Sequence, residues 1–156
     1  MSAMLSIQSE PFDPGAELNA FIAATDGAGA AVTFTGIMRS TPDDPVSAMT
    51  IEHYPELARA EIERIMSRAM EQFSLLDVRV IHRFGRLLPG EPIMQVMTLA
   101  PHRRAAFEAA EYLMDYLKTD APFWKLEERP SGASWVESKA SDEGARAARI
   151  PIQSTS

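Results

Sequence analysis

The 156-residue sequence contains no cysteine. Disulfides, thiolate metal ligands, persulfides and thiol nucleophiles all need cysteine, so none of them belongs to this chain's own chemistry. The three histidines, His53, His82 and His102, lie far apart and form no HxH or HExxH motif. We therefore expect neither a metal site nor a bound cofactor.

Long apolar runs and positive charge are also scarce. No apolar stretch approaches the roughly 18 residues of a membrane span, and the N-terminal residues lack the basic start and apolar core of a signal peptide, so we expect a cytoplasmic protein without membrane attachment. The net charge of −7 argues against nucleic-acid binding, which needs a basic face. The acidity is uneven, because residues 1–60 carry eight acidic residues against two arginines. A site for an anion must therefore be built locally from a few cations.

The length and composition predict one domain over residues 1–156, with a tail after about residue 138 that is partly flexible. Helix caps and polar–apolar alternation predict the order helix, strand, strand, helix, strand, strand, helix, strand, strand. Because hairpins outnumber parallel crossovers, the predicted fold class is α+β, with a mainly antiparallel sheet backed by helices. The predicted elements are a short helix from Pro14, strands at 31–38 and 48–54, a helix at 55–73, strands at 75–85 and 92–100, a helix at 102–118, and strands at 123–128 and 133–138.

The stretch "DYLKTDAPFWKLEE" places lysines on both sides of an aromatic pair. In the simplest interpretation, Lys118 interacts favourably with the dipole at a helix C-terminus, and Lys125 points outward from an edge strand. Alternatively, Phe123 and Trp124 wall a pocket in which the two ammonium groups repel each other. One lysine would then lose its proton more easily than a solvated lysine and act as base or nucleophile, while the other binds an anion.

A second group of cations surrounds the start of the third predicted helix. His102 and Arg103 lie where free N–H groups and the helix dipole favour an anion, although an arginine there can also be an ordinary surface residue. Arg39 follows a strand and is either a binding residue at a strand–loop junction or a solvated side chain. We expect His53 to be a hydrogen-bonded supporting residue and His82 to be a satisfied core histidine.

The length of the third predicted helix leads to a prediction about how the chain assembles. His102 and Lys118 are 16 residues apart, so one straight helix separates them by about 24 Å. A small ligand spans about half that distance. If both ends contact the same ligand, one end must come from a second copy, which predicts a symmetric dimer with two composite sites.

Five stretches resemble, in order and spacing, the large catalytic subunit of molybdopterin synthase, over roughly residues 30 to 138. They are "VTFTGIMRS", "IEHYPELA", "VIHRFGRLLPGE", "HRRAAFEAAEYLMDYLK" and "APFWKLE…WVE". The resemblance implies a fold of the α/β-hammerhead type. It also implies a sulfurtransferase that makes the molybdopterin dithiolene from cyclic pyranopterin monophosphate.

The same resemblance implies partners. The sulfur arrives on a small ubiquitin-like subunit whose C-terminal Gly-Gly ends in a thiocarboxylate. A homodimer lies at the centre of a heterotetramer, with one small subunit on each outer side. A chain without cysteine cannot carry the sulfur as a persulfide, which fits an external donor.

Site residues follow from the matched stretches. Lys118 and Lys125 are implied to be catalytic, one activating or holding the substrate or tail and the other stabilising negative charge. The residues implied to bind substrate are Ile37, Met38, Arg39, His102, Arg103, Leu126 and Glu127, with Lys139 as an additional anion contact.

Two other function classes are compatible with parts of the pattern. A non-catalytic module that docks a ubiquitin-like Gly-Gly tail also needs aromatic side chains and a cation, but it does not require His102 and Arg103. A nucleotide-dependent transferase is disfavoured because the sequence has no glycine-rich phosphate loop.

Overall fold

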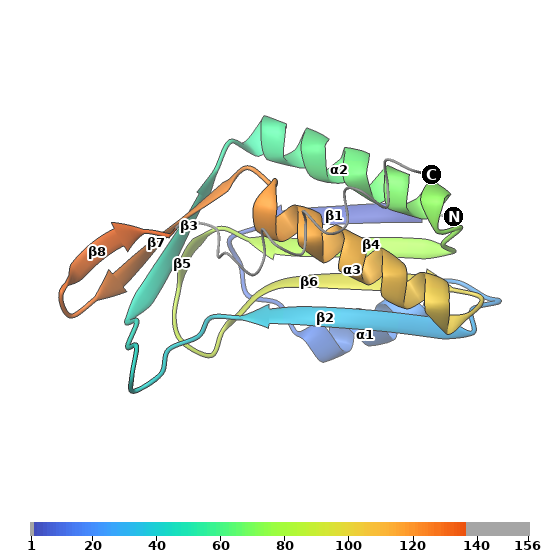
Figure 1. The fold of residues 1–156 in the computed structure, drawn as a ribbon. Helices are drawn as coiled ribbons and strands as arrows, with labels where there is room; N and C mark the ends of the chain where they lie inside the picture. Colours follow the sequence, from blue (N-terminus) through green and yellow to red (C-terminus); the bar gives the residue numbers. More distant parts are fainter. Residues whose placement is uncertain (1, 137–156) are drawn as a thin grey trace.

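A computed structural model of the chain describes residues 2–136, so Lys139 and the tail predicted after residue 138 lie outside the described residues. The described chain folds into two four-stranded sheets and three helices (Figure 1). The elements are β1 (Ser2–Gln8), α1 (Pro14–Ala23), β2 (Ala30–Ile37), β3 (Ala48–His53), α2 (Pro55–Gln72), β4 (Asp77–Arg83), β5 (Gly85–Leu87), β6 (Pro92–Ala100), α3 (Arg103–Thr119), β7 (Phe123–Arg129) and β8 (Gly132–Trp135).

The first sheet has the strand order β1-β4-β6-β2, in which β1 runs parallel to β4 and the other pairs are antiparallel. Helices α2 and α3 pack across one face of this sheet, and α1 covers part of the other (Figure 1). Because both faces are covered, β4 is buried along most of its length, including the charged residues Asp77 and Arg83. This sandwich of helices and sheet holds the main apolar core.

The helices begin where the sequence predicts. Asp13 caps α1, its carboxylate accepting hydrogen bonds from the backbone N–H groups of Gly15 and Ala16 at 3.0 and 3.2 Å, and Pro14 follows at the first helical position. Helix α2 buries one side, as its 3.6-residue period predicts. Helix α3 starts after His102, and Lys118 lies in its last turn.

The second sheet has the order β5-β3-β7-β8 and is antiparallel throughout. It lies at one end of the first sheet, next to the C-terminal end of α3 (Figure 1). Strands β7 and β8 form the hairpin predicted around Gly132, whose φ of 126° is a conformation that favours glycine. The chain leaves α3 at Thr119 and enters this sheet at Phe123, so the two predicted lysines lie on either side of a tight connection.

The α+β class is confirmed, with two sheets instead of the single sheet that the sequence predicts. Strands β1 and β5 were not predicted. Every residue of β1 pairs with β4, about 75 positions away, so its formation depends on a contact that local sequence does not encode. In the described part of the chain, no helix is both long enough and apolar enough to span a membrane.

Candidate active site

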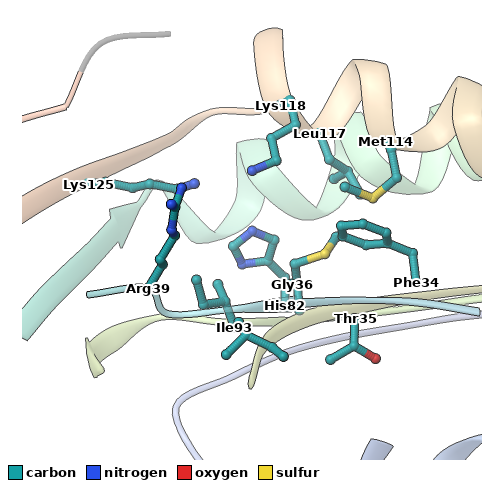
Figure 2. Close-up of a pocket in the computed structure, with 12 residues that line it drawn as sticks. Phe34, Thr35, Gly36, Arg39, His82, Ile93, Met114, Leu117, Lys118 and Lys125 are labelled. Carbon is teal, nitrogen blue, oxygen red and sulfur yellow. The ribbon is translucent and has the colours of Figure 1, made fainter. Parts of the chain in front are cut away.

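A cavity of about 300 Å³ opens beside the C-terminal end of α3, where the two sheets meet (Figure 2). The cavity is lined by residues of β2, β4, β6, α3 and β7 and by one residue of the loop that follows β2. The lining residues are Phe34, Thr35, Gly36, Ile37, Arg39, His82, Ile93, Met94, Met114, Leu117, Lys118 and Lys125.

Three cations line this cavity. Arg39 comes from the loop after β2, Lys118 from the last turn of α3 and Lys125 from β7, and Figure 2 shows their side chains extending toward a common space. Among the described residues that line it, there is no aspartate or glutamate. Like charges held together repel, so this arrangement is stabilised when an anion enters. Four of the sequence-predicted residues, these three and Ile37, are thus brought together by the fold.

Other predicted residues lie beside the cavity without lining it. Met38 is buried in the main core, and Leu126 and Glu127 follow Lys125 along β7. The Glu127 carboxylate forms an ion pair with Arg129 at 2.8 Å. Direct contact of these three residues with a substrate stays a prediction.

His102 and Arg103 lie at the far end of α3 from Lys118, and both are exposed. A helix of this length separates its ends by about 24 Å, as the sequence argument requires. Neither residue lines the cavity of its own chain. Their contribution to a second chain's cavity stays a prediction.

The aromatic wall differs from the predicted one. Successive residues of a strand point to opposite faces, so Trp124 and Lys125 diverge. Trp124 packs edge-to-face against Tyr54, with ring centroids 5.2 Å apart, and lines a separate hollow of about 380 Å³ together with Glu52, His53 and Trp135. The prediction that Trp124 walls the lysine pocket was therefore wrong. Phe34 and several aliphatic and methionine side chains take that place.

Phe123 shares the face of Lys125 and stacks on His82, with ring centroids 3.9 Å apart and an interplanar angle of 7°. His82 is buried, as predicted, but it also lines the cavity, which sequence reasoning missed. The pKa of His82 is lowered to about 4, mainly by burial and in smaller part by the charges of Lys125 and Lys118, against the opposing effect of its hydrogen bond to the backbone of Arg83. Its place on the apolar face of β4 predicted a core residue, and only the packing of α3 and β7 over that face places it at the cavity.

This arrangement supports a limited set of reactions. Cations in this arrangement can bind an anion, a deprotonated lysine amine can act as base or nucleophile, and an apolar wall restricts water. Within residues 2–136, no group of three or more histidine, aspartate and glutamate side chains is placed to hold a metal ion.

Comparisons with known proteins agree on one family. Residues 7–120 match the family model described as MoaE protein. A molybdopterin synthase catalytic subunit of Cereibacter sphaeroides is 52% identical over 139 residues, covering 89% of this chain and 94% of that protein. A second, of Rhizobium meliloti, is 47% identical and covers 90% of this chain and 91% of that protein.

A solved structure gives the same result. The molybdopterin biosynthesis MoaE protein from Burkholderia ambifaria superposes with a TM-score of 0.79 at 42% identity, covering 94% of this chain and 97% of that chain. A chain from the complex of subunits 1 and 2 of molybdopterin-converting factor from Helicobacter pylori shares the fold, with a TM-score of 0.73 at 21% identity over 86% of this chain and 91% of that chain.

Proposed function

The chain belongs to the MoaE protein family, and from that premise we propose that it is the catalytic subunit of a molybdopterin synthase. Its reaction is the transfer of sulfur to cyclic pyranopterin monophosphate, which forms the molybdopterin dithiolene. The sulfur donor is the thiocarboxylated C-terminus of a small ubiquitin-like subunit. The chain works in the cytoplasm, as a homodimer at the centre of a heterotetramer.

The observation that carries this proposal is the gathering of Arg39, Lys118 and Lys125 around one cavity in a chain of net charge −7. Both proposed ligands are anions, one a cyclic phosphate and the other a thiocarboxylate. The positively charged side chains of one pocket can bind both anions. Because the chain has no cysteine, it cannot carry the sulfur as a persulfide and needs an external sulfur carrier.

The chemistry assigns complementary roles to the two lysines. The dithiolene needs two sulfur atoms, so two thiocarboxylated tails are used in turn. In each transfer, a carbon–sulfur bond forms on the precursor and the oxygen substituent of that carbon leaves, while the carbon–sulfur bond of the tail breaks and water supplies the oxygen of the carboxylate that remains. One lysine holds or activates the substrate or tail, and the other stabilises the negative charge that develops. The apolar wall around Phe34 and Met114 limits the water that reaches the reacting groups.

A dimer completes the site in this proposal. His102 and Arg103 at the start of α3 reach the cavity of the partner copy and bind the phosphate or the pterin. Support comes from helix geometry, because the two ends of α3 are too far apart to contact one small ligand within one chain. Ile37, Met38, Leu126 and Glu127 bind the substrate beside the lysines, and Lys139 adds a further contact to the anion.

Reconstitution tests the function. The full chain is mixed with thiocarboxylated small subunit and cyclic pyranopterin monophosphate, and dithiolene formation is measured. We expect the wild type to form product. The rate of dithiolene formation in Lys118→Ala should fall on the order of a thousandfold, because the substitution removes an amine that acts on the reacting groups.

The control is Arg68→Ala, which removes the same charge from an exposed position on α2 and should leave the rate unchanged. A Lys118→Ala protein that forms dithiolene at the wild-type rate would overturn the catalytic role. A wild-type protein that forms none under saturating partner and precursor would overturn the function.

A further inference from the structure

His82 is a buried titratable residue that the proposed sulfur transfer does not use. It extends from β4 into the cavity below the end of Lys118 (Figure 2), and only 4% of its surface is exposed. One face of its ring lies flat on Phe123, with centroids 3.9 Å apart. The imidazole is therefore held in one orientation at the cavity wall.

The hydrogen bond on one ring nitrogen determines what the other can do. Nδ1 of His82 lies 2.8 Å from the backbone carbonyl oxygen of Arg83. A carbonyl oxygen only accepts hydrogen bonds, so Nδ1 carries the proton and donates it. In the neutral ring, Nε2 then keeps its lone pair and acts as an acceptor.

The surroundings keep the ring neutral. The pKa of His82 is lowered to about 4, chiefly by burial. The titratable groups of the neighbouring elements, Lys125 on β7, His53 on β3 and Lys118 on α3, act in the same direction, and only the hydrogen bond to the Arg83 carbonyl opposes them. Nearly every molecule therefore has a neutral His82 at pH 7. Nε2 of His82 is therefore a hydrogen-bond acceptor at pH 7.

The other polar side chains of the cavity have the opposite character. In their charged forms, Arg39, Lys118 and Lys125 are hydrogen-bond donors without an acceptor atom, so they bind the phosphate and the thiocarboxylate. A pterin ring also presents N–H donors on its edge, and these cations cannot accept a hydrogen bond from them. Figure 2 shows the Thr35 side chain pointing away from the cavity, so among the described lining residues His82 is the side chain whose ring nitrogen is fixed as an acceptor.

We propose that His82 is a substrate-binding residue whose Nε2 accepts a hydrogen bond from an N–H group of the pterin ring. The inference rests on the proposed function and adds to it a division of labour within the cavity. The cations bind the charged groups, and His82 orients the uncharged heterocycle. The cavity thereby distinguishes a donor-bearing heterocycle from a simple phosphate.

Calorimetry on the full chain tests this division, with cyclic pyranopterin monophosphate and inorganic phosphate as separate ligands. His82→Phe keeps an aromatic ring against Phe123 but has no acceptor. We expect its affinity for the pterin to fall on the order of tenfold, because a ligand donor is buried without a partner, while its affinity for phosphate is unchanged. In steady-state assays KM should rise and kcat should hold.

Two further variants separate binding from folding. His82→Gln should recover most of the pterin affinity, because its amide N–H can donate to Arg83 while its amide oxygen accepts from the ligand. His53→Phe changes the imidazole on the other side of Phe123, which lines the other hollow, and should bind the pterin like the wild type. Should His82→Phe not fold, His82→Met replaces it under the same criteria.

The inference fails if the acceptor-free variant binds the pterin as tightly as the wild type, or if phosphate affinity falls by the same factor. That failure is distinct from failure of the proposed function. An active wild type with an unaffected His82→Phe variant rejects only the role of His82, whereas an inactive wild type in the reconstituted system rejects the function itself.

Discussion

Two hollows lie on opposite faces of the short strand β7, and they differ in charge and in lining. On one face, Lys125 joins Lys118 and Arg39 around a cavity that has no acidic residue among its described lining residues. On the other face, Trp124 joins other aromatic side chains and Glu52 around a hollow whose lining has no lysine or arginine. One step along the strand separates a cationic environment from an aromatic, acidic one.

This comparison shows that neighbours in the sequence need not be neighbours in a site. Because Trp124 and Lys125 are adjacent in the sequence, they suggest one aromatic pocket with lysines. In a strand, however, adjacent side chains point to opposite faces of the sheet. Phe123, two positions from Lys125, stays on the cavity side through its stack with His82. Lys118 and Lys125 line one cavity, whereas the hypothesis of a tryptophan wall is wrong.

The largest effect is expected from a test of whether a second copy completes the cation cavity. Arg103→Ala and Lys118→Ala homodimers should both be nearly inactive. In a mixed dimer of the two variants, one site receives both defects and the other none if Arg103 reaches across. Dithiolene formation should then return to about half of the wild-type rate.

The same experiment has a positive control and a contradicting result. A mixed dimer of Arg68→Ala with Lys118→Ala should reach about half activity whether or not the sites are composite. If the Arg103/Lys118 mixed dimer stays as inactive as its parents while this control recovers, Arg103 acts within its own chain. Differently tagged chains allow the mixed dimers to be purified.

A smaller effect is expected in the pH dependence of the free energy of unfolding. His82, which lines the cation cavity, should contribute more to this dependence than His53, which lines the other hollow. His82 has a folded-state pKa of about 4 against a usual value of 6.5. Between these values the unfolded chain binds more protons than the folded chain, so stability falls as the pH is lowered through this window, by about 3 kcal/mol in total. Burial also lowers the pKa of His53, which is only half-buried.

Urea denaturation between pH 7 and pH 4 measures this dependence. His82→Gln should lose less free energy of unfolding over the window than the wild type, since the carboxylates that titrate in the same range are common to both proteins. His53→Gln should change the slope less. An unchanged slope in His82→Gln would show that the buried neutral imidazole does not contribute as described.

The sequence predicted the elements whose signals are local. Asp13 with Pro14 marks the start of α1, and the apolar period of α2 predicts the face that packs on the sheet. The β7–β8 hairpin follows from the turn at Gly132. Strand β1 was not predicted because it depends on pairing with β4, which is distant in the sequence. Strand β5 was not predicted because three residues are too few to show an alternation of polar and apolar side chains.

The candidate site was predictable in part for the same reason. Arg39, Lys118 and Lys125 were selected by residue type, by position at the ends of elements and by the family resemblance, and the fold brings them to one cavity. His82 could not be selected, because an apolar strand face gives the same pattern whether it meets a core or a cavity. The positions of α3 and β7 over that face decide between the two.

The most direct test compares the two adjacent residues that face the two hollows. Lys125→Ala and Trp124→Ala are each reconstituted with saturating thiocarboxylated partner and cyclic pyranopterin monophosphate, and single-turnover dithiolene formation is measured. Lys125→Ala should slow the reaction on the order of a thousandfold, while Trp124→Ala should stay within about twofold of the wild type. A wild-type rate in Lys125→Ala, or equal losses in both variants, would contradict the assignment of the chemistry to the cation cavity.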